Sequence, residues 1–173
     1  LLDALSATGF ADNTMVVFTS DHGDMMGERG MWFKKTLFEQ AVRVPMIVRY
    51  PNSSPSGARQ TPVSLVDLLP TCLSVAGIDS SELLTEIDGE DLAQLADDSR
   101  ANIRPVFIEH LDGATHAPRV MVRLGCYKYV YSEAYPPQLF DLRSDPEQLD
   151  NLSGRDVHAA AEQELHALVR QRW

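Results

Sequence analysis

An aspartate and a histidine stand side by side at Asp21 and His22, and a lysine follows at Lys34. An ionised carboxylate and a neutral imidazole can bind a divalent metal ion together, and the same pair can exchange protons with a substrate. A lysine ammonium can stabilise negative charge on a leaving oxygen. A capping aspartate, a surface histidine and a surface lysine would give the same three residue types. The spacing alone therefore leaves a metal site, an acid/base pair and an ordinary surface all open.

The residues before this group predict the element that positions it. Met15-Val16-Val17-Phe18 is a short run of β-branched and aromatic residues between two turn-forming segments. Such a run predicts a buried strand, here over 15–19. In α/β folds, ligands bind at the carboxyl ends of parallel strands. After the pair, Gly23, Gly27 and Gly30 favour an irregular loop, which suits a site better than a helix does.

The loop also carries a family pattern. It reads Ser20-Asp21-His22-Gly23-Asp24, then Gly27-Glu28-Arg29-Gly30, then Trp32-Phe33-Lys34. This series resembles the second metal-binding block of the type I sulfatases of the alkaline phosphatase superfamily, and is most similar to choline sulfatases. The resemblance implies that Asp21 and His22 are metal ligands. It also implies that Lys34 is catalytic and binds substrate, contacting the sulfate and the leaving oxygen.

The resemblance implies one divalent metal ion, with Ca²⁺ favoured by the family. Mn²⁺ is also possible, because an imidazole is less usual around Ca²⁺. Many arylsulfatases carry Asn at the position of His22, so this histidine favours choline sulfatases or the phosphonate and phosphodiester hydrolases of the superfamily. Glu28 and Arg29 could support the metal loop from behind, or form a salt bridge with no further role.

A second candidate for substrate binding is Glu109, at the end of the predicted strand 106–109. The matching position in choline sulfatases is implicated in meeting the quaternary ammonium, and a carboxylate beside an aromatic wall suits such a cation. A glutamate at the end of a strand in solvent is the alternative.

Type I sulfatases use a formylglycine nucleophile made within a Cys/Ser-x-Pro-x-Arg motif. Cys72 is followed by Leu-Ser-Val-Ala and Cys126 by Tyr-Lys-Tyr-Val, so neither matches. The early paired aspartates that complete the family's metal shell are absent as well. We therefore expect the chain to be the C-terminal portion of a sulfatase, with the formylglycine in a missing N-terminal part, and to be inactive alone.

The remaining pattern predicts an α/β fold in two parts. Residues 1–100 are expected to be the end of an alkaline-phosphatase-like sulfatase sheet carrying the metal loop, with a helix over 68–76 capped by Asp67. Residues 101–173 are expected to form a small antiparallel sheet, with a hairpin about Gly125-Cys126 and an amphipathic C-terminal helix over 156–173. Leu139-Phe140-Asp141-Leu142, followed by Asp145-Pro146-Glu147, closely resembles the family's C-terminal strand and turn.

Composition narrows the class of partner. A net charge of -10 argues against a nucleic-acid or anionic-membrane surface, and no run reaches the length of a membrane span. The expected partner is a small-molecule sulfate ester, with choline sulfate as the leading candidate. The resemblance further implies a homo-oligomer and a bacterial cytoplasmic or periplasmic location. A phosphonate or phosphodiester hydrolase, or a non-catalytic domain that kept the fold, are the alternatives.

Overall fold

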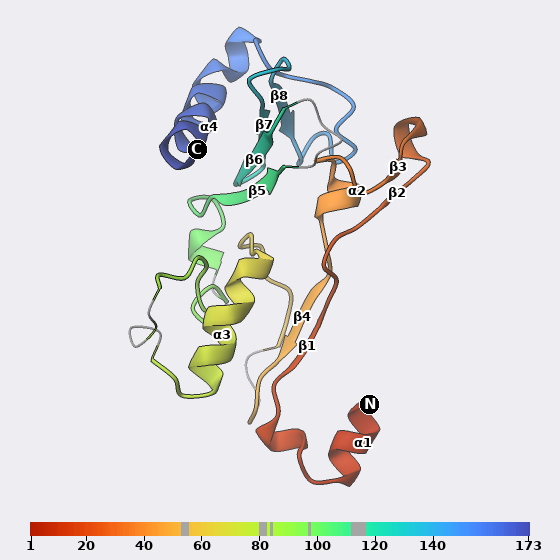
Figure 1. Ribbon diagram of the computed structural model, residues 1–173, viewed down its shortest axis with the longest axis vertical. Coiled ribbons are helices and arrows are strands. Elements are labelled where there is room, and N and C mark those ends of the chain that lie inside the picture. Colours follow the sequence, from red (N-terminus) through yellow and green to blue (C-terminus); the bar gives the residue numbers. More distant parts are fainter. Residues whose placement is uncertain (53–55, 80–82, 84, 97, 112–116) are drawn as a thin grey trace.

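The computed structural model describes residues 1–52, 56–79, 83, 85–96, 98–111 and 117–173. The chain is elongated, with a small sheet and the C-terminal helix at one end and the N-terminal helix at the other (Figure 1). The helices are α1 (Leu2–Ala7), α2 (Glu39–Val42), α3 (Leu68–Val75) and α4 (Ala159–Arg172). The strands are β1 (Val16–Thr19), β2 (Met25–Met26), β3 (Trp32–Phe33), β4 (Met46–Arg49), β5 (Val106–His110), β6 (Arg119–Leu124), β7 (Tyr127–Tyr131) and β8 (Gln138–Asp141).

The strand predicted over 15–19 forms as β1, but it is not buried. It pairs antiparallel with β4 in a two-stranded ribbon, in which Phe18 lies opposite Ile47. These two side chains are 61% and 63% exposed. The apolar run was sufficient to predict an extended strand. A two-stranded ribbon cannot cover its own faces, however, and the described residues supply no parallel neighbour.

The helix predicted over 68–76 is confirmed as α3, whereas the role predicted for Asp67 is wrong. Its carboxylate does not cap α3. It accepts the Ser64 N–H at 2.7 Å, within a capping box on the 3₁₀ turn Leu65–Asp67. It also accepts a hydrogen bond from buried Arg104 at 2.6 Å. A carboxylate this deep needs a cation, and that cation comes from a distant part of the sequence.

The predicted small antiparallel sheet is confirmed, with strand order β5-β6-β7-β8. The hairpin between β6 and β7 turns at Gly125 and Cys126, and Gly125 has a φ of 57°. A positive φ is readily adopted by glycine, which explains its place in this tight turn. The predicted C-terminal helix is also present, as a 3₁₀ turn at Asp156–His158 that leads into α4.

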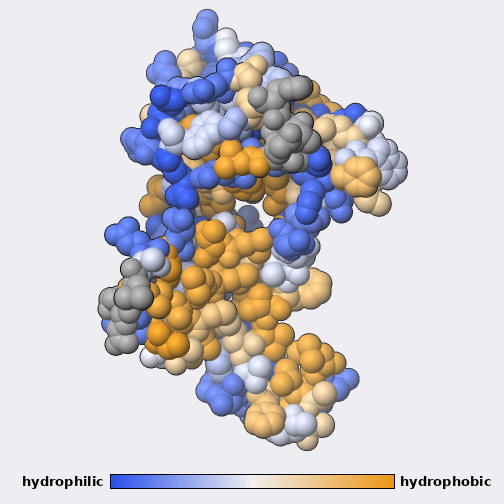
Figure 2. Space-filling view, in the orientation of Figure 1, coloured by the Kyte–Doolittle hydropathy of each residue, from blue (hydrophilic) through white to orange (hydrophobic). Residues whose placement is uncertain are grey.

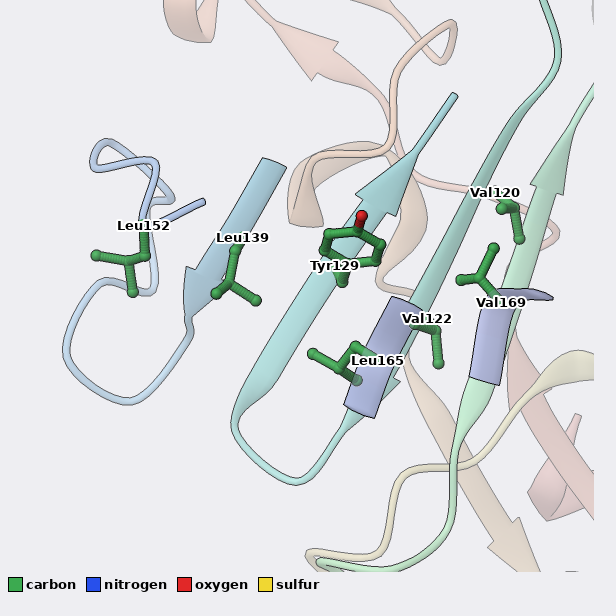
Figure 3. Close-up of a cluster of buried hydrophobic side chains, with 7 residues drawn as sticks. All are labelled: Val120, Val122, Tyr129, Leu139, Leu152, Leu165 and Val169. Atoms are coloured by element: carbon green, nitrogen blue, oxygen red, sulfur yellow. The ribbon is translucent and has the colours of Figure 1, made fainter. Parts of the chain in front are cut away.

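One face of this sheet packs on α4 and forms a closed apolar core (Figure 3). The core joins β6, β7 and β8 to the helix and consists of Val120, Val122, Tyr129, Leu139, Leu152, Leu165 and Val169. Side chains alternate between the two faces of a strand. The neighbouring residues Met121 and Val130 therefore point the other way, where they pack against Leu37. The segment that follows the metal loop thus covers the second face of the small sheet.

No helix in the described part of the chain has the length and apolar character needed to cross a membrane. The surface is not uniform. Hydrophobic side chains gather over α3 and the segments beside it, whereas the small-sheet end is more polar (Figure 2).

Candidate metal and catalytic site

The loop after β1 folds back on itself and brings the three predicted residues together. It forms a short hairpin in which β2 pairs with β3, so that Met25 lies opposite Phe33. The hairpin returns the chain to its starting point, and Lys34 Nζ lies 2.7 Å from His22 Nε2. Asp21 Oδ2 lies 3.4 Å from the same His22 nitrogen. A carboxylate, an imidazole and an ammonium therefore converge on one point.

The contacts of His22 determine which ring nitrogen is available to a ligand. Its Nδ1 lies 2.8 Å from the Gly23 carbonyl oxygen. A carbonyl oxygen only accepts, so Nδ1 carries the proton and donates it. In the neutral ring, Nε2 then has a lone pair, which accepts a hydrogen bond from Lys34 Nζ. Metal-binding histidines commonly have this arrangement, in which a backbone carbonyl fixes the tautomer and frees the other nitrogen.

Asp21 is more accessible than His22, since its side chain is 84% exposed and that of His22 is 32% exposed. Its Oδ1 accepts the backbone N–H of His22 at 3.0 Å. Desolvation raises the pKa of Asp21, but the charge of His22, the backbone hydrogen bonds and Lys34 together lower it below its usual value. The carboxylate is therefore ionised at neutral pH and free to bind a cation.

The donor set fits one part of a divalent metal shell. Asp21 offers a hard oxygen and His22 an imidazole nitrogen, and both are adjacent and accessible. No cluster of three or more ligand-type side chains occurs among the described residues. Asp21 and His22 thus offer two ligands, and a metal shell completed by the missing N-terminal part stays a prediction.

A close backbone contact fixes the first part of the loop. The Gly23 N–H donates to the Ala41 carbonyl at 2.9 Å, which binds the loop to α2. A Cβ built on Gly23 would lie 2.0 Å from the Gln40 carbonyl oxygen. Only glycine fits there, so the glycine after His22 serves close packing as well as turning.

Arg29 fastens the middle of the loop to the C-terminal part. Its guanidinium donates to the backbone carbonyls of Glu147 and, at 2.8 Å, Gln148, and lies 4.0 Å from the centre of the Phe38 ring. Glu28 instead accepts the Met26 N–H at 2.6 Å. Two roles were considered for Arg29, support of the metal loop and a salt bridge with no further role. These contacts fit the first.

Three residues that sequence reasoning did not select join the segment after the loop to the small sheet. They are Glu39, Lys128 and Gln148. Lys128 is fully buried in the middle of β7. Burial lowers the pKa of its ammonium, and the Glu39 carboxylate, 2.8 Å away, opposes that shift. A lysine inside an otherwise apolar strand was the available signal, because a buried lysine requires a partner.

Glu109 is not brought to this group. Its register partner is Val120, and Phe107, two residues earlier, packs against the core beneath α4. Glu109 therefore lies on the α4 face of the sheet, where Arg172 Nε is 3.6 Å from its carboxylate. The metal loop is connected to the opposite face. Substrate binding by Glu109 stays a prediction.

The chain is similar in sequence to proteins of one known family. Residues 1–78 match the sequence model of the family described as Sulfatase. A choline-sulfatase of Rhizobium meliloti (strain 1021) is 42% identical over 153 residues, which are 88% of this chain and 30% of that relative. The chain thus spans about 30% of the length of this curated relative and corresponds to its C-terminal part.

Solved structures show the same likeness. A 2-O GAG sulfatase superposes with a TM-score of 0.83 at 28% identity, over 99% of this chain and 38% of that chain. A phosphonate monoester hydrolase of Agrobacterium radiobacter gives 0.77 at 26% identity, over 99% and 38%. These superpositions confirm the predicted fold class, a mixed α/β fold with small antiparallel sheets and a C-terminal helix.

Proposed function

Because this chain belongs to the sulfatase family, we propose that it is the C-terminal part of an enzyme that hydrolyses an organic sulfate ester, with choline sulfate as the preferred substrate. The observation that carries the proposal is the convergence of Asp21 Oδ2 and Lys34 Nζ on His22 Nε2. The similarity to a choline-sulfatase supports the choice of ester. A formylglycine nucleophile would come from the part of the parent enzyme outside this chain.

In the proposed reaction, Asp21 and His22 would be two of the ligands of a divalent metal ion. Such an ion, when bound, polarises sulfate oxygens as a Lewis acid. Nε2 of His22 has a single lone pair, so a metal ion and the Lys34 ammonium exclude each other there. Lys34 is then available to face the substrate. Its positive charge stabilises the negative charge that builds on the leaving oxygen.

The test is the activity of the full-length parent toward choline sulfate after single substitutions in the loop. Asp21→Asn and Lys34→Ala are each expected to lower kcat/KM by at least about 100-fold, the scale of losing one preorganised electrostatic group. Lys35→Ala is the matched control, because Lys35 is the exposed neighbour of Lys34. Near-normal rates in both loop variants would remove these roles.

The structural likeness to a phosphonate monoester hydrolase favours one alternative, hydrolysis of a phosphonate or phosphate diester. The same three residues would serve it, because both reactions build negative charge on a leaving oxygen. Comparing kcat/KM of the parent on choline sulfate and on a phosphonate monoester separates the two. A strong preference for the phosphonate would overturn the sulfatase assignment.

A further inference from the structure

The face of the small sheet opposite α4 contains a buried cation that is tied to the metal loop. Lys128 is fully buried on β7, and its ammonium donates to Glu39 Oε1 at 2.8 Å. An ammonium without a partner in this position would be costly. Glu39 is the first residue of α2, the helix that follows the metal loop. The ion pair therefore binds the beginning of α2 to the middle of the sheet.

Gln148 adds a second connection between the sheet and the first residue of α2. Its Oε1 accepts the Glu39 N–H at 2.8 Å and lies 3.5 Å from Lys128 Nζ. Both partners are donors, so the amide oxygen must face them. The N–H of Glu39 belongs to the first turn of α2 and has no partner within that helix. Gln148 supplies the acceptor that this helix end needs.

Gln148 occupies an unfavourable position. Its φ is 56°, in the left-handed region, and its side-chain Nε2 is buried without a hydrogen-bond partner. The residue is only 2% exposed. A backbone conformation and a buried donor of this kind persist when the surroundings require that residue there. The requirement visible here is the amide oxygen, which joins α2 to Lys128.

Three hydrogen bonds, joined by short stretches of covalent backbone, lead from Gln148 to His22. From Glu39 the path follows α2 to Ala41, whose carbonyl accepts the Gly23 N–H. The Gly23 carbonyl in turn accepts the proton of His22 Nδ1. A second tie comes from Arg29, which donates to the Gln148 carbonyl. The loop is thus held both beside His22 and in its middle.

We propose that Gln148 is a positioning residue of the site, which holds the loop from Asp21 to Lys34 in its converging arrangement through α2 and Arg29. It touches none of the three residues itself. The catalytic consequence rests on the function proposed above, whereas the mechanical consequence, a looser loop when the amide oxygen is lost, does not.

The test compares three variants of the full-length parent. Gln148→Met removes the acceptor at nearly constant volume, and Gln148→Glu keeps an acceptor facing Glu39 N–H and Lys128. Gln163→Met is the matched control, at an exposed position on α4. Amide hydrogen exchange is followed by mass spectrometry in segments 20–42 and 159–172. Rates on choline sulfate are measured in parallel.

We expect Gln148→Met to speed exchange in 20–42 by about 10-fold, the factor for losing a hydrogen bond, without speeding it in 159–172. Because the reacting groups lose their alignment, kcat should fall about 10- to 100-fold with little change in KM. Gln148→Glu keeps the acceptor but adds a buried negative charge near Glu39, so it should restore the exchange and the rate in part. Gln163→Met should resemble the unsubstituted enzyme.

Unchanged exchange in 20–42, or an equal increase in 159–172, would overturn the proposal, since Gln148 would then be inert or only generally stabilising. If the unsubstituted parent does not hydrolyse sulfate esters, the proposed function fails, and the exchange experiment still decides the positioning role. Should Gln148→Met not fold, Arg29→Gln tests the same turn. It removes the loop's bonds to the Glu147 and Gln148 carbonyls without disturbing Lys128, and faster exchange in 20–42 is again expected.

Discussion

Two regions of this molecule differ in how completely their apolar side chains are buried. The C-terminal sheet has a closed core, since seven apolar side chains from the sheet, α4 and the segment after β8 pack together (Figure 3). The β1–β4 ribbon and α3 leave much of their apolar surface open (Figure 2). The exposed side chains there include Phe18, Ile47, Val66, Leu69, Val75 and Ile78.

The site loop belongs to both regions. It leaves the open ribbon at Thr19, but its hydrogen bonds to distant residues run to the closed region, through Arg29 and α2. Asp21 and His22 follow β1 of the ribbon directly in the sequence. The position of the loop is fixed by its hydrogen bonds to residues at the small sheet. A site can therefore be held firmly even where the strand leading to it is poorly covered.

Separating the two regions should produce the largest effect. We expect residues 101–173 to fold alone with a stability of about 3–5 kcal/mol, the range for a core of this size. Residues 1–100 alone should show no cooperative transition, because a two-stranded ribbon lacks sufficient buried surface. Urea unfolding followed by far-UV circular dichroism measures both. Cooperative unfolding of 1–100 would contradict the contrast between the two regions. It would also contradict the predicted domain boundary at residues 100 and 101, which stays a prediction.

The next largest effect should come from the ion pair that joins the regions. Arg104→Met leaves the buried Asp67 carboxylate without its cation, and we expect the free energy of unfolding of the chain to fall by about 3–5 kcal/mol. Adding Asp67→Asn should recover part of this loss. Arg155→Met breaks an exposed pair with Asp150, which solvent screens, and should lower the free energy of unfolding far less than Arg104→Met does. Equal losses in the two arginine variants would show that burial does not matter here.

Matched truncations of apolar side chains should give the smallest effects and the sharpest contrast. Leu139→Ala empties part of the closed core and should cost about 2–5 kcal/mol in equilibrium denaturation of the chain. Ile47→Ala removes an exposed side chain and should change stability by no more than about 0.5 kcal/mol. The same Ile47→Ala change in the longer parent is informative, because a loss above about 1 kcal/mol there would show that another segment covers the ribbon. Similar costs at both positions in this chain would invalidate the contrast.

Local patterns predicted the elements well. The hairpin about Gly125-Cys126 followed from two apolar runs and a glycine turn, and α4 followed from apolar residues at helical spacing. Asp21, His22 and Lys34 were selected from one continuous stretch, so their convergence needs only a short hairpin. Asp67 was misassigned because its main partner, Arg104, lies 37 residues away. A capping pattern gives no information about such a partner.

The sequence by itself determined the residue types of the site, the larger strands and helices, and the resemblance to sulfatases, because these depend on neighbouring residues. It predicted an irregular loop where β2 and β3 pair. Only the tertiary structure decided which face of the small sheet receives the metal loop, that Gln148 and Lys128 hold it there, and that Glu109 points to the other face. It also decided that β1 is only partly buried, with Phe18 exposed. Burial and pairing depend on segments far apart in the chain, and no local pattern specifies which of them meet.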